Sequence, residues 1–293
     1  MRTDTVKNLL AAVGAVFLAL IVLSLLIAYF SGRGPIGGED KVAVVNLEGV
    51  IADPLDFTAE LRDYEERDDV KAVVVRINSP GGGVGPSQEI YSAIKRLKKK
   101  KKVVASMGAI AASGGFYAAM AADKIVANPG TITGSIGVIV EFMNAEDLLS
   151  KIGLQGYVIK SGQFKDTGSP LRKMTPEERA LIQDVIDDVN GQFISAVAEG
   201  RGLKEEAVRK IADGRIFSGS QAVKQGLVDK LGDLADAIDL GAELAGIKGK
   251  PYVIYPEKKV FGLWNAVFGE SIANLAGQLS GLRIMYMTPN QAK

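Results

Sequence analysis

Short runs of β-branched residues recur along this chain from residue 41 onward, and they restrict the fold more than any other feature. The segments KVAVVNL and KAVVVRI are nearly uninterrupted apolar runs, as expected of strands covered on both faces of a sheet. VVASM, KIVA and YVIK continue the series, and segments with helical periodicity separate these runs. Alternating strands and helices predict an α/β fold with a largely parallel sheet and flanking helices.

Three of the helical segments carry start signals. One begins near Pro86, and another begins at about Ser113, directly after the predicted strand VVASM. The clearest signal precedes the third segment, where Thr175 is the expected N-cap and Glu178 completes a capping box. Pro176 between them suits the first helical position.

Residues 9–30 form an uncharged apolar run that, as a helix, is long enough to cross a ~30 Å hydrocarbon core. No A-x-A-like cleavage site follows it, so we expect an uncleaved transmembrane signal anchor after a short tail, 1–8. A Gly-rich linker at 31–40 then leads to a folded domain at 41–250. We expect a single-pass protein of the cell membrane with this domain on the extracytoplasmic side, although the flanking charges tie and leave the sidedness open.

The last segment, 251–293, contains apolar residues at helical three- and four-residue steps. They predict one amphipathic helix, formed by Val260, Leu263, Trp264, Val267, Phe268, Ile272, Leu275 and Leu279. Three glycines weaken this helix and its polar face is not basic, so we favour packing on a subunit or domain over membrane binding.

The chain has no histidine and no cysteine, which excludes several kinds of site. Ser-His-Asp triads, Cys-His pairs and zinc sites built from His or Cys are impossible here. Any catalytic base must be Lys, Tyr, Asp, Glu or a chain terminus. The net charge of +1 argues against a nucleic-acid partner, and no Walker A loop or metal-binding motif is present, so we expect no cofactor.

Two glycine-containing stretches are the candidate site. In INSPGGGV, residues 77–84, three glycines leave a predicted strand and enter a predicted loop whose N–H groups suit an oxyanion hole. In GAIAASGGFYAAMAAD, Ser113 stands at a helix N-terminus, where the backbone dipole favours negative charge. Each stretch has a plainer explanation, tight packing or a phosphate cradle for the first and a helix cap for the second.

Together, SPGGGV, AASGGFYAA and ANPGTITGSIGV resemble the signal peptide peptidase A family, in the order that the family has them. The resemblance covers about 42–240 and includes IKSGQFKDTGSP and DGRIFSGSQAVKQGLVD. One domain and one N-terminal span look like the short form of this family. The resemblance implies a fold shared with the Clp protease and with crotonases, and a serine endopeptidase that uses a lysine as its base.

The resemblance also implies roles for individual residues. Ser113 matches the nucleophile and Lys165, in SGQFKDTGSP, matches the base. Lysine acts as a base near neutral pH only where removal from water lowers the pKa of its ammonium, so such a lysine must be desolvated. The backbone N–H groups of Gly82 and Gly114 match the oxyanion donors, and Ser135 matches a serine that orients the lysine.

Three alternatives stay open for these roles. Gly83 competes with Gly82 as an oxyanion donor because the glycines are consecutive. Lys160 and Lys124 are rival bases, although strand or surface placement explains both. The expected strands GGGV and SIGV would bind an extended peptide at a sheet edge.

The resemblance implies hydrophobic peptides such as signal peptides as substrates, cleaved through an acyl-enzyme without ATP. It also implies a homo-oligomeric ring, an octamer for a single-domain form, with the dyad formed within one chain or between subunits. Three alternatives are a stomatin-type membrane-associated serine-lysine protease, a crotonase-like acyl-CoA enzyme and a non-catalytic membrane scaffold. The spacing from Ser113 to Lys165 favours the signal-peptide group over the stomatin-type group.

Overall fold

The computed structural model describes residues 14–23, 40–255 and 285–287, and the chain divides into two units between residues 39 and 40. In the first unit, residues 14–23 are helical. No helix within the described ranges combines the length and apolar character needed to cross a membrane. The rest of the predicted anchor, most of the predicted linker and the predicted amphipathic helix at 260–279 lie outside the described residues.

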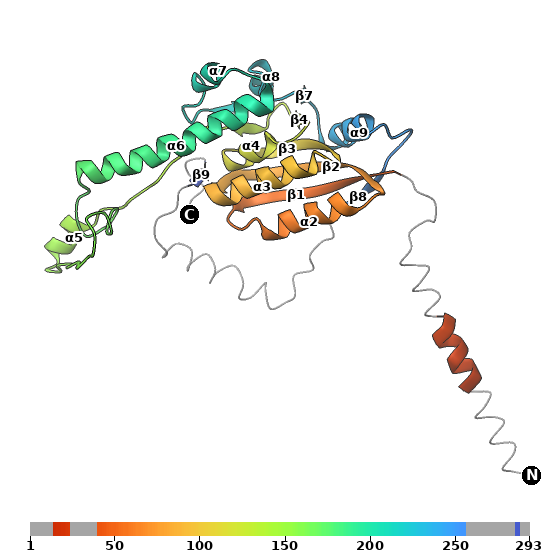
Figure 1. Ribbon diagram of the computed structural model, residues 1–293, viewed down its shortest axis with the longest axis horizontal. Helices are drawn as coiled ribbons and strands as arrows, with labels where there is room; N and C mark the ends of the chain where they lie inside the picture. The colour runs from red at the N-terminus through yellow and green to blue at the C-terminus, as the bar shows by residue number, and fades with distance from the viewer. Residues whose placement is uncertain (1–13, 24–39, 256–284, 288–293) are drawn as a thin grey trace, which may run out of the picture. The chain divides into compact units, whose positions relative to one another are not determined.

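The second unit is an α/β domain whose described part contains a sheet of nine strands (Figure 1). The strands are β1 (Lys41–Ile51), β2 (Val70–Gly83), β3 (Lys102–Ala112), β4 (Lys124–Ala127), β5 (Ile132–Gly134), β6 (Ile216–Ser218), β7 (Lys230–Leu231), β8 (Tyr252–Ile254) and β9 (Met285–Met287). The helices are α2 (Leu55–Glu66), α3 (Val84–Leu97), α4 (Gly114–Ala119), α5 (Glu146–Lys151), α6 (Pro176–Arg201), α7 (Glu205–Arg209), α8 (Gly219–Lys224) and α9 (Leu234–Leu244).

The sheet is mostly parallel, which confirms the predicted class. Its main path runs in the order β6-β5-β3-β2-β1-β8, while β4 pairs with β3 and β7. The pairs β1–β2 and β2–β3 are parallel and long, and α2 and α3 connect them. β5–β6 and β2–β9 are antiparallel.

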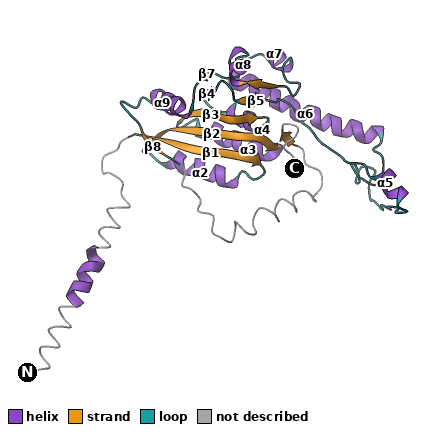
Figure 2. Ribbon diagram, turned by 180° about the vertical axis from the view of Figure 1, so that it is seen from behind, coloured by secondary structure: helices purple, strands orange, loops and turns teal. Residues whose placement is uncertain are grey.

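Both faces of the central strands are buried, which explains their uninterrupted apolar sequences. In β1, Ala43 and Val45 join the larger core cluster with residues of α2, α3 and α4, whereas Val42 and Val44 join a smaller cluster with α9. Figure 2 shows the two helical layers on either side of the strands. Side chains alternate between the faces of a strand, so a strand with helices on both sides is apolar at every position.

Helix α6 links the core to an arm formed by residues 139–175. The helix begins with the predicted capping box of Thr175 and Glu178, and it ends at Arg201, followed by the C-cap Gly202 with its left-handed backbone. Phe193 and Val197 bury its C-terminal half in the core. Its N-terminal half lies alongside the arm, and α5 lies at the end of this arm away from the sheet (Figure 1).

Three local expectations are wrong. YVIK, residues 157–160, forms no strand, since it lies in the arm, where Tyr157 and Ile159 are exposed and no neighbouring strand pairs with them. The glycines at 81–83 do not form a loop, because β2 continues through Gly83 and stays paired with β1. SIGV, residues 135–138, follows β5 without being a strand.

Candidate active site

Ser113 lies at the junction of β3 and α4 and has an unusual backbone conformation. Its φ and ψ are 54° and −118°, which residues other than glycine rarely adopt. The backbone is held in place because the N–H of Ser113 donates to the Gly134 carbonyl at 2.8 Å and its own carbonyl accepts from the Tyr117 N–H at 2.8 Å. Backbone strain of this kind costs about 1–3 kcal/mol and occurs preferentially at functional sites.

The Ser113 hydroxyl is completely buried and has no hydrogen-bond partner among the described residues. An unpaired buried hydroxyl destabilises a fold, since it has lost its contacts with water without gaining others. A simple helix cap would accept a hydrogen bond from the first turn, and Ser113 makes no such bond with α4. The capping explanation for this serine is therefore wrong.

The backbone of Gly114 lies against the glycine end of β2. A Cβ atom added to Gly114 would be 3.3 Å from the backbone nitrogen of Gly82 and 2.3 Å from Ser87 Oγ. Added to Gly83, it would instead meet the Pro86 ring at 3.1 Å. Of the consecutive glycines, Gly82 is thus the one whose backbone nitrogen lies beside Gly114.

Two buried serines that the sequence analysis did not single out fix this glycine segment. Ser87 Oγ donates to the Gly83 carbonyl at 2.7 Å. Ser79 Oγ donates to the Gly49 carbonyl at 2.6 Å and accepts from the Gly81 N–H at 3.1 Å. Serines that flank a run of glycines are a weak sequence signal. The Ser87 contact is local, but the Gly49 carbonyl is brought to Ser79 only by the fold.

The glycine end of β2 also pairs with an extended segment from much later in the chain. The short strand β9 runs antiparallel to it, with Met285 opposite Gly83 and Met287 opposite Gly81. Backbone groups of these glycines therefore face an added antiparallel strand. This edge lies directly beside the Gly114 backbone.

Ser135 lies close to Ser113 because β3 and β5 end side by side. Ala112 pairs with Gly134, so the two serines are the next residues on neighbouring parallel strands. Ser135 is buried and also has a positive φ, 52°, and its N–H donates to the Arg215 carbonyl at 2.8 Å. The proposed orienting role of its hydroxyl stays a prediction.

Lys165 lies apart from this group in the structure. It is exposed on the arm, and its side chain has no hydrogen-bond or ion-pair partner in the described part of the chain. The rival lysines are both paired, since Lys160 Nζ contacts the Asp166 carboxylate at 2.5 Å and Lys124 Nζ contacts the Asp229 carboxylate at 3.2 Å. A general base needs a free lone pair, so these ion pairs disfavour Lys160 and Lys124.

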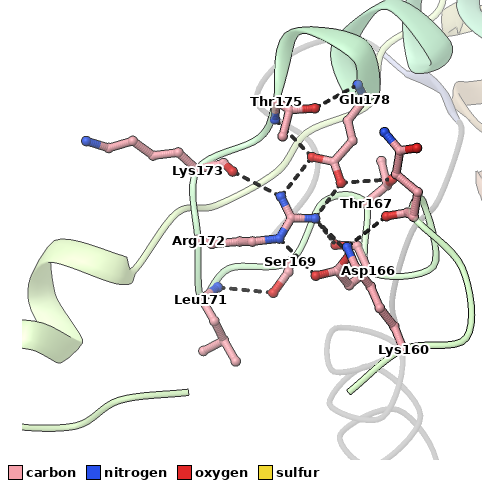
Figure 3. Close-up of polar contacts among 10 residues, drawn as sticks. Lys160, Asp166, Thr167, Ser169, Leu171, Arg172, Lys173, Thr175 and Glu178 are labelled. Carbon is pink, nitrogen blue, oxygen red and sulfur yellow. Dashed lines mark hydrogen bonds and ion pairs between the residues drawn. The ribbon is translucent and has the colours of Figure 1, made fainter. Parts of the chain in front are cut away.

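Figure 3 shows a cluster of charged residues in the arm, formed around Arg172, and one of its members, Asp166, directly follows Lys165 in the chain. Arg172 binds the carboxylates of Asp166 and Glu178 at once, and hydrogen bonds from its guanidinium lower the pKa of Asp166 well below the usual range and that of Glu178 to about 2. The same carboxylates raise the pKa of Arg172. The sequence pattern indicates Glu178 only as part of a helix cap, and no local pattern indicates this cluster.

A parallel α/β sheet that delivers a buried, strained serine to a helix N-terminus beside a glycine-rich strand edge is the framework of a serine hydrolase with a Clp protease-like fold. In agreement, residues 44–131 match the family model described as Clp protease. Residues 95–248, just over half of the chain, match the model described as peptidase family S49. The chain belongs to peptidase family S49 and is a serine peptidase.

Individual relatives agree with this assignment. A protein of Synechocystis sp. that is provisionally named a protease is 51% identical over 209 residues, which are 71% of this chain and 75% of that protein. An Enterococcus faecium protein provisionally named signal peptide peptidase SppA is 38% identical, over 68% of this chain and 62% of the relative. Protease 4 of Salmonella typhi is 37% identical, over 75% of this chain and 37% of its own length.

Proposed function

We propose that this protein is a membrane-anchored endopeptidase that hydrolyses signal peptides and other hydrophobic peptides with Ser113 as nucleophile and Lys165 as base. The observation that carries the proposal is the Ser113 hydroxyl, buried and unpaired at the head of α4 with the Gly114 backbone beside the Gly82 nitrogen. A chain without histidine needs another base for such a serine. Lys165 has the family's motif around it and no competing partner among the described side chains.

Peptide hydrolysis then proceeds in two steps. Ser113 Oγ attacks the scissile carbonyl carbon while the Lys165 amine takes its proton, and the N–H groups of Gly82 and Gly114 stabilise the oxyanion. The ammonium returns the proton to the leaving amine as the carbon–nitrogen bond breaks and the acyl-enzyme forms. Lys165 next takes a proton from water, whose oxygen attacks the ester, and Ser113 recovers its proton as the acid product leaves.

We infer that a second copy of the chain supplies Lys165 to Ser113. Within one chain the lysine is exposed on the arm, whereas the serine hydroxyl is buried and unbonded. The arm also exposes many large apolar side chains, which in soluble proteins mark interaction surfaces; they are Met143, Leu148, Ile152, Leu154, Tyr157 and Ile159. A contact with the next copy would cover them and remove the Lys165 amine from water, which favours its uncharged form.

A closed ring satisfies this arrangement, because each copy then gives its arm to one neighbour and receives an arm from the other. A ring of eight copies remains our expectation for this single-domain chain. Non-catalytic scaffolding and acyl-CoA chemistry are disfavoured by the match to a peptidase family.

The substrate is expected to bind as an added strand along Gly81–Gly83. The antiparallel strand β9 occupies this edge, so a substrate peptide would replace β9 and pair with the same backbone groups. The apolar run at 9–30 would hold the domain at a membrane, where hydrophobic peptide remnants gather.

Hydrolysis of a synthetic signal peptide by the detergent-solubilised protein tests this proposal. Wild-type protein, Ser113→Ala and Lys165→Ala are compared without nucleotide across a pH series. We expect both variants to be inactive and the wild-type rate to rise as an amine deprotonates. An inert wild type, or full activity in either variant, would contradict the proposal.

A further inference from the structure

All three nitrogen atoms of the Arg172 guanidinium donate hydrogen bonds to neighbouring residues. Its Nε and Nη2 donate to the two Asp166 oxygens, each at 2.8 Å. Nη1 donates to Glu178 Oε2 at 2.8 Å and to the Lys173 carbonyl at 3.1 Å, and Nη2 also binds Glu178 Oε1. These five contacts use all five N–H donors of the side chain, with forked geometry toward both carboxylates.

The two carboxylates belong to different parts of the structure, which Arg172 joins. Glu178 lies in the first turn of α6, with its side chain 2% exposed, and also completes the capping box with Thr175. Helix α6 is anchored in the core at its other end through Phe193 and Val197. Arg172 therefore ties Asp166 to a helix that reaches the protein core.

Asp166 belongs to the turn that carries Lys165. In this turn the Lys165 N–H donates to the Gly162 carbonyl at 3.2 Å, and the Ser169 N–H donates to the Asp166 carbonyl at 3.0 Å. The Asp166 side chain is 11% exposed and is also bound by Lys160. The Asp166 carboxylate is held from two sides, by Arg172 and Lys160, and these contacts restrain the turn that carries Lys165.

We propose that Arg172 is a positioning residue for Lys165: its paired hydrogen bonds to Asp166 and Glu178 set the position of the general base. This inference rests on the proposed function, in which Lys165 must reach the Ser113 hydroxyl of another copy. The arm has no strand pairing at 157–160 to hold it, so the charged cluster is the main polar restraint near the base. Misplacement of a catalytic group by about 1 Å reduces the rate about 100-fold.

A lysine in place of Arg172 should not perform this positioning role. Its ammonium has three donors on a flexible stem and cannot fork onto two carboxylates. Arg172→Lys keeps the charge and loses the geometry, whereas Arg172→Ala loses both. A role in positioning predicts that the rate falls in both variants, and more in the second.

A matched control exists elsewhere in the domain. Arg67 makes a similar forked ion pair with Asp69, at 3.1 and 2.9 Å, after the end of α2. This pair is exposed and far in sequence from the arm. Arg67→Ala removes a pair of arginine–carboxylate hydrogen bonds of the same type and should leave the rate of peptide cleavage unchanged.

The experiment measures kcat, KM and thermal midpoint for wild type, Arg172→Lys, Arg172→Ala, Arg67→Ala, Ser113→Ala and Lys165→Ala on one synthetic signal peptide, with and without added guanidinium chloride at low millimolar concentration. We expect kcat to fall about 100-fold in Arg172→Ala with little change in KM, and guanidinium to restore part of it. Guanidinium should not rescue Lys165→Ala. If Arg172→Ala does not fold, Arg172→Lys decides the question.

Two sets of results separate the inference from the proposed function. Wild-type kcat in Arg172→Lys and Arg172→Ala, or a loss that follows the thermal midpoint and is not rescued, overturns the role of Arg172 while dependence on Ser113 and Lys165 still holds. Activity retained in Ser113→Ala or Lys165→Ala overturns the proposed function itself.

Discussion

Replacing Gly114 with alanine places a methyl group in the contact between the head of α4 and the glycine end of β2. The new Cβ would be 2.3 Å from Ser87 Oγ, which is itself buried and bonded to the Gly83 carbonyl. Relief of this contact requires a shift of about 1 Å, and overpacking of this kind costs about 1–3 kcal/mol of stability. The same shift moves the Gly114 N–H away from the oxyanion, and loss of one such donor lowers kcat about 100- to 1,000-fold.

Two controls separate the stability effect from the catalytic effect. Gly191, within α6, has open space around an added Cβ, so Gly191→Ala should gain up to about 1 kcal/mol and keep its activity. In the double variant Ser87→Ala with Gly114→Ala the clashing oxygen is gone, and we expect much of the stability but little of the rate to return. Denaturant unfolding and peptide cleavage are measured on the same samples. Wild-type stability and kcat in Gly114→Ala would refute the described packing of these two segments.

Three further predictions follow from the described contacts. In the unassembled chain, Ser113→Ala should raise the free energy of unfolding by about 1 kcal/mol, because it removes an unpaired buried hydroxyl, and Ser113→Gly should raise it further by relieving the positive φ. A lower thermal midpoint of the unassembled variant would mean that the hydroxyl has a partner within its own chain. Since Arg172 lowers the pKa of Asp166 and Glu178 from ordinary values of 3.8 and 4.5, their stabilising contribution is complete above those values and is lost as pH falls toward 2. The thermal midpoint should therefore drop from pH 5 to pH 2.5, by less in Arg172→Met, and equal drops would contradict the pairing. Truncation after residue 284 removes the strand that occupies Gly81–Gly83, so peptide cleavage should become faster, and an unchanged KM and kcat would show that substrate does not bind along that edge.

The sequence predicted most of what the local pattern controls. Uninterrupted β-branched runs identified β1 and β2 as doubly covered strands, and the capping box at Thr175 located the start of α6. Both signals depend on residues within one element. The meeting of Gly114 with Gly82 followed from the resemblance, because no local pattern specifies which glycine of three approaches another loop.

Features that depend on distant partners could not be predicted in this way. YVIK has strand composition but lies in an arm without a neighbouring strand, and the described pairing decides its structure. Arg172 gave no sequence signal, since its role arises from Asp166 on a turn and Glu178 on a helix. Likewise, nothing in the sequence indicated that Lys165 would be exposed while Ser113 is buried.

Mixing two inactive variants tests most directly whether Ser113 and Lys165 of adjacent copies form the catalytic dyad. Ser113→Ala and Lys165→Ala are co-expressed in equal amounts, purified as mixed oligomers and assayed on a synthetic signal peptide. If neighbours share each site, about one quarter of the sites receive both residues and a corresponding fraction of the wild-type rate returns. No recovery in mixed oligomers, beside an active wild type, would contradict a dyad shared between copies.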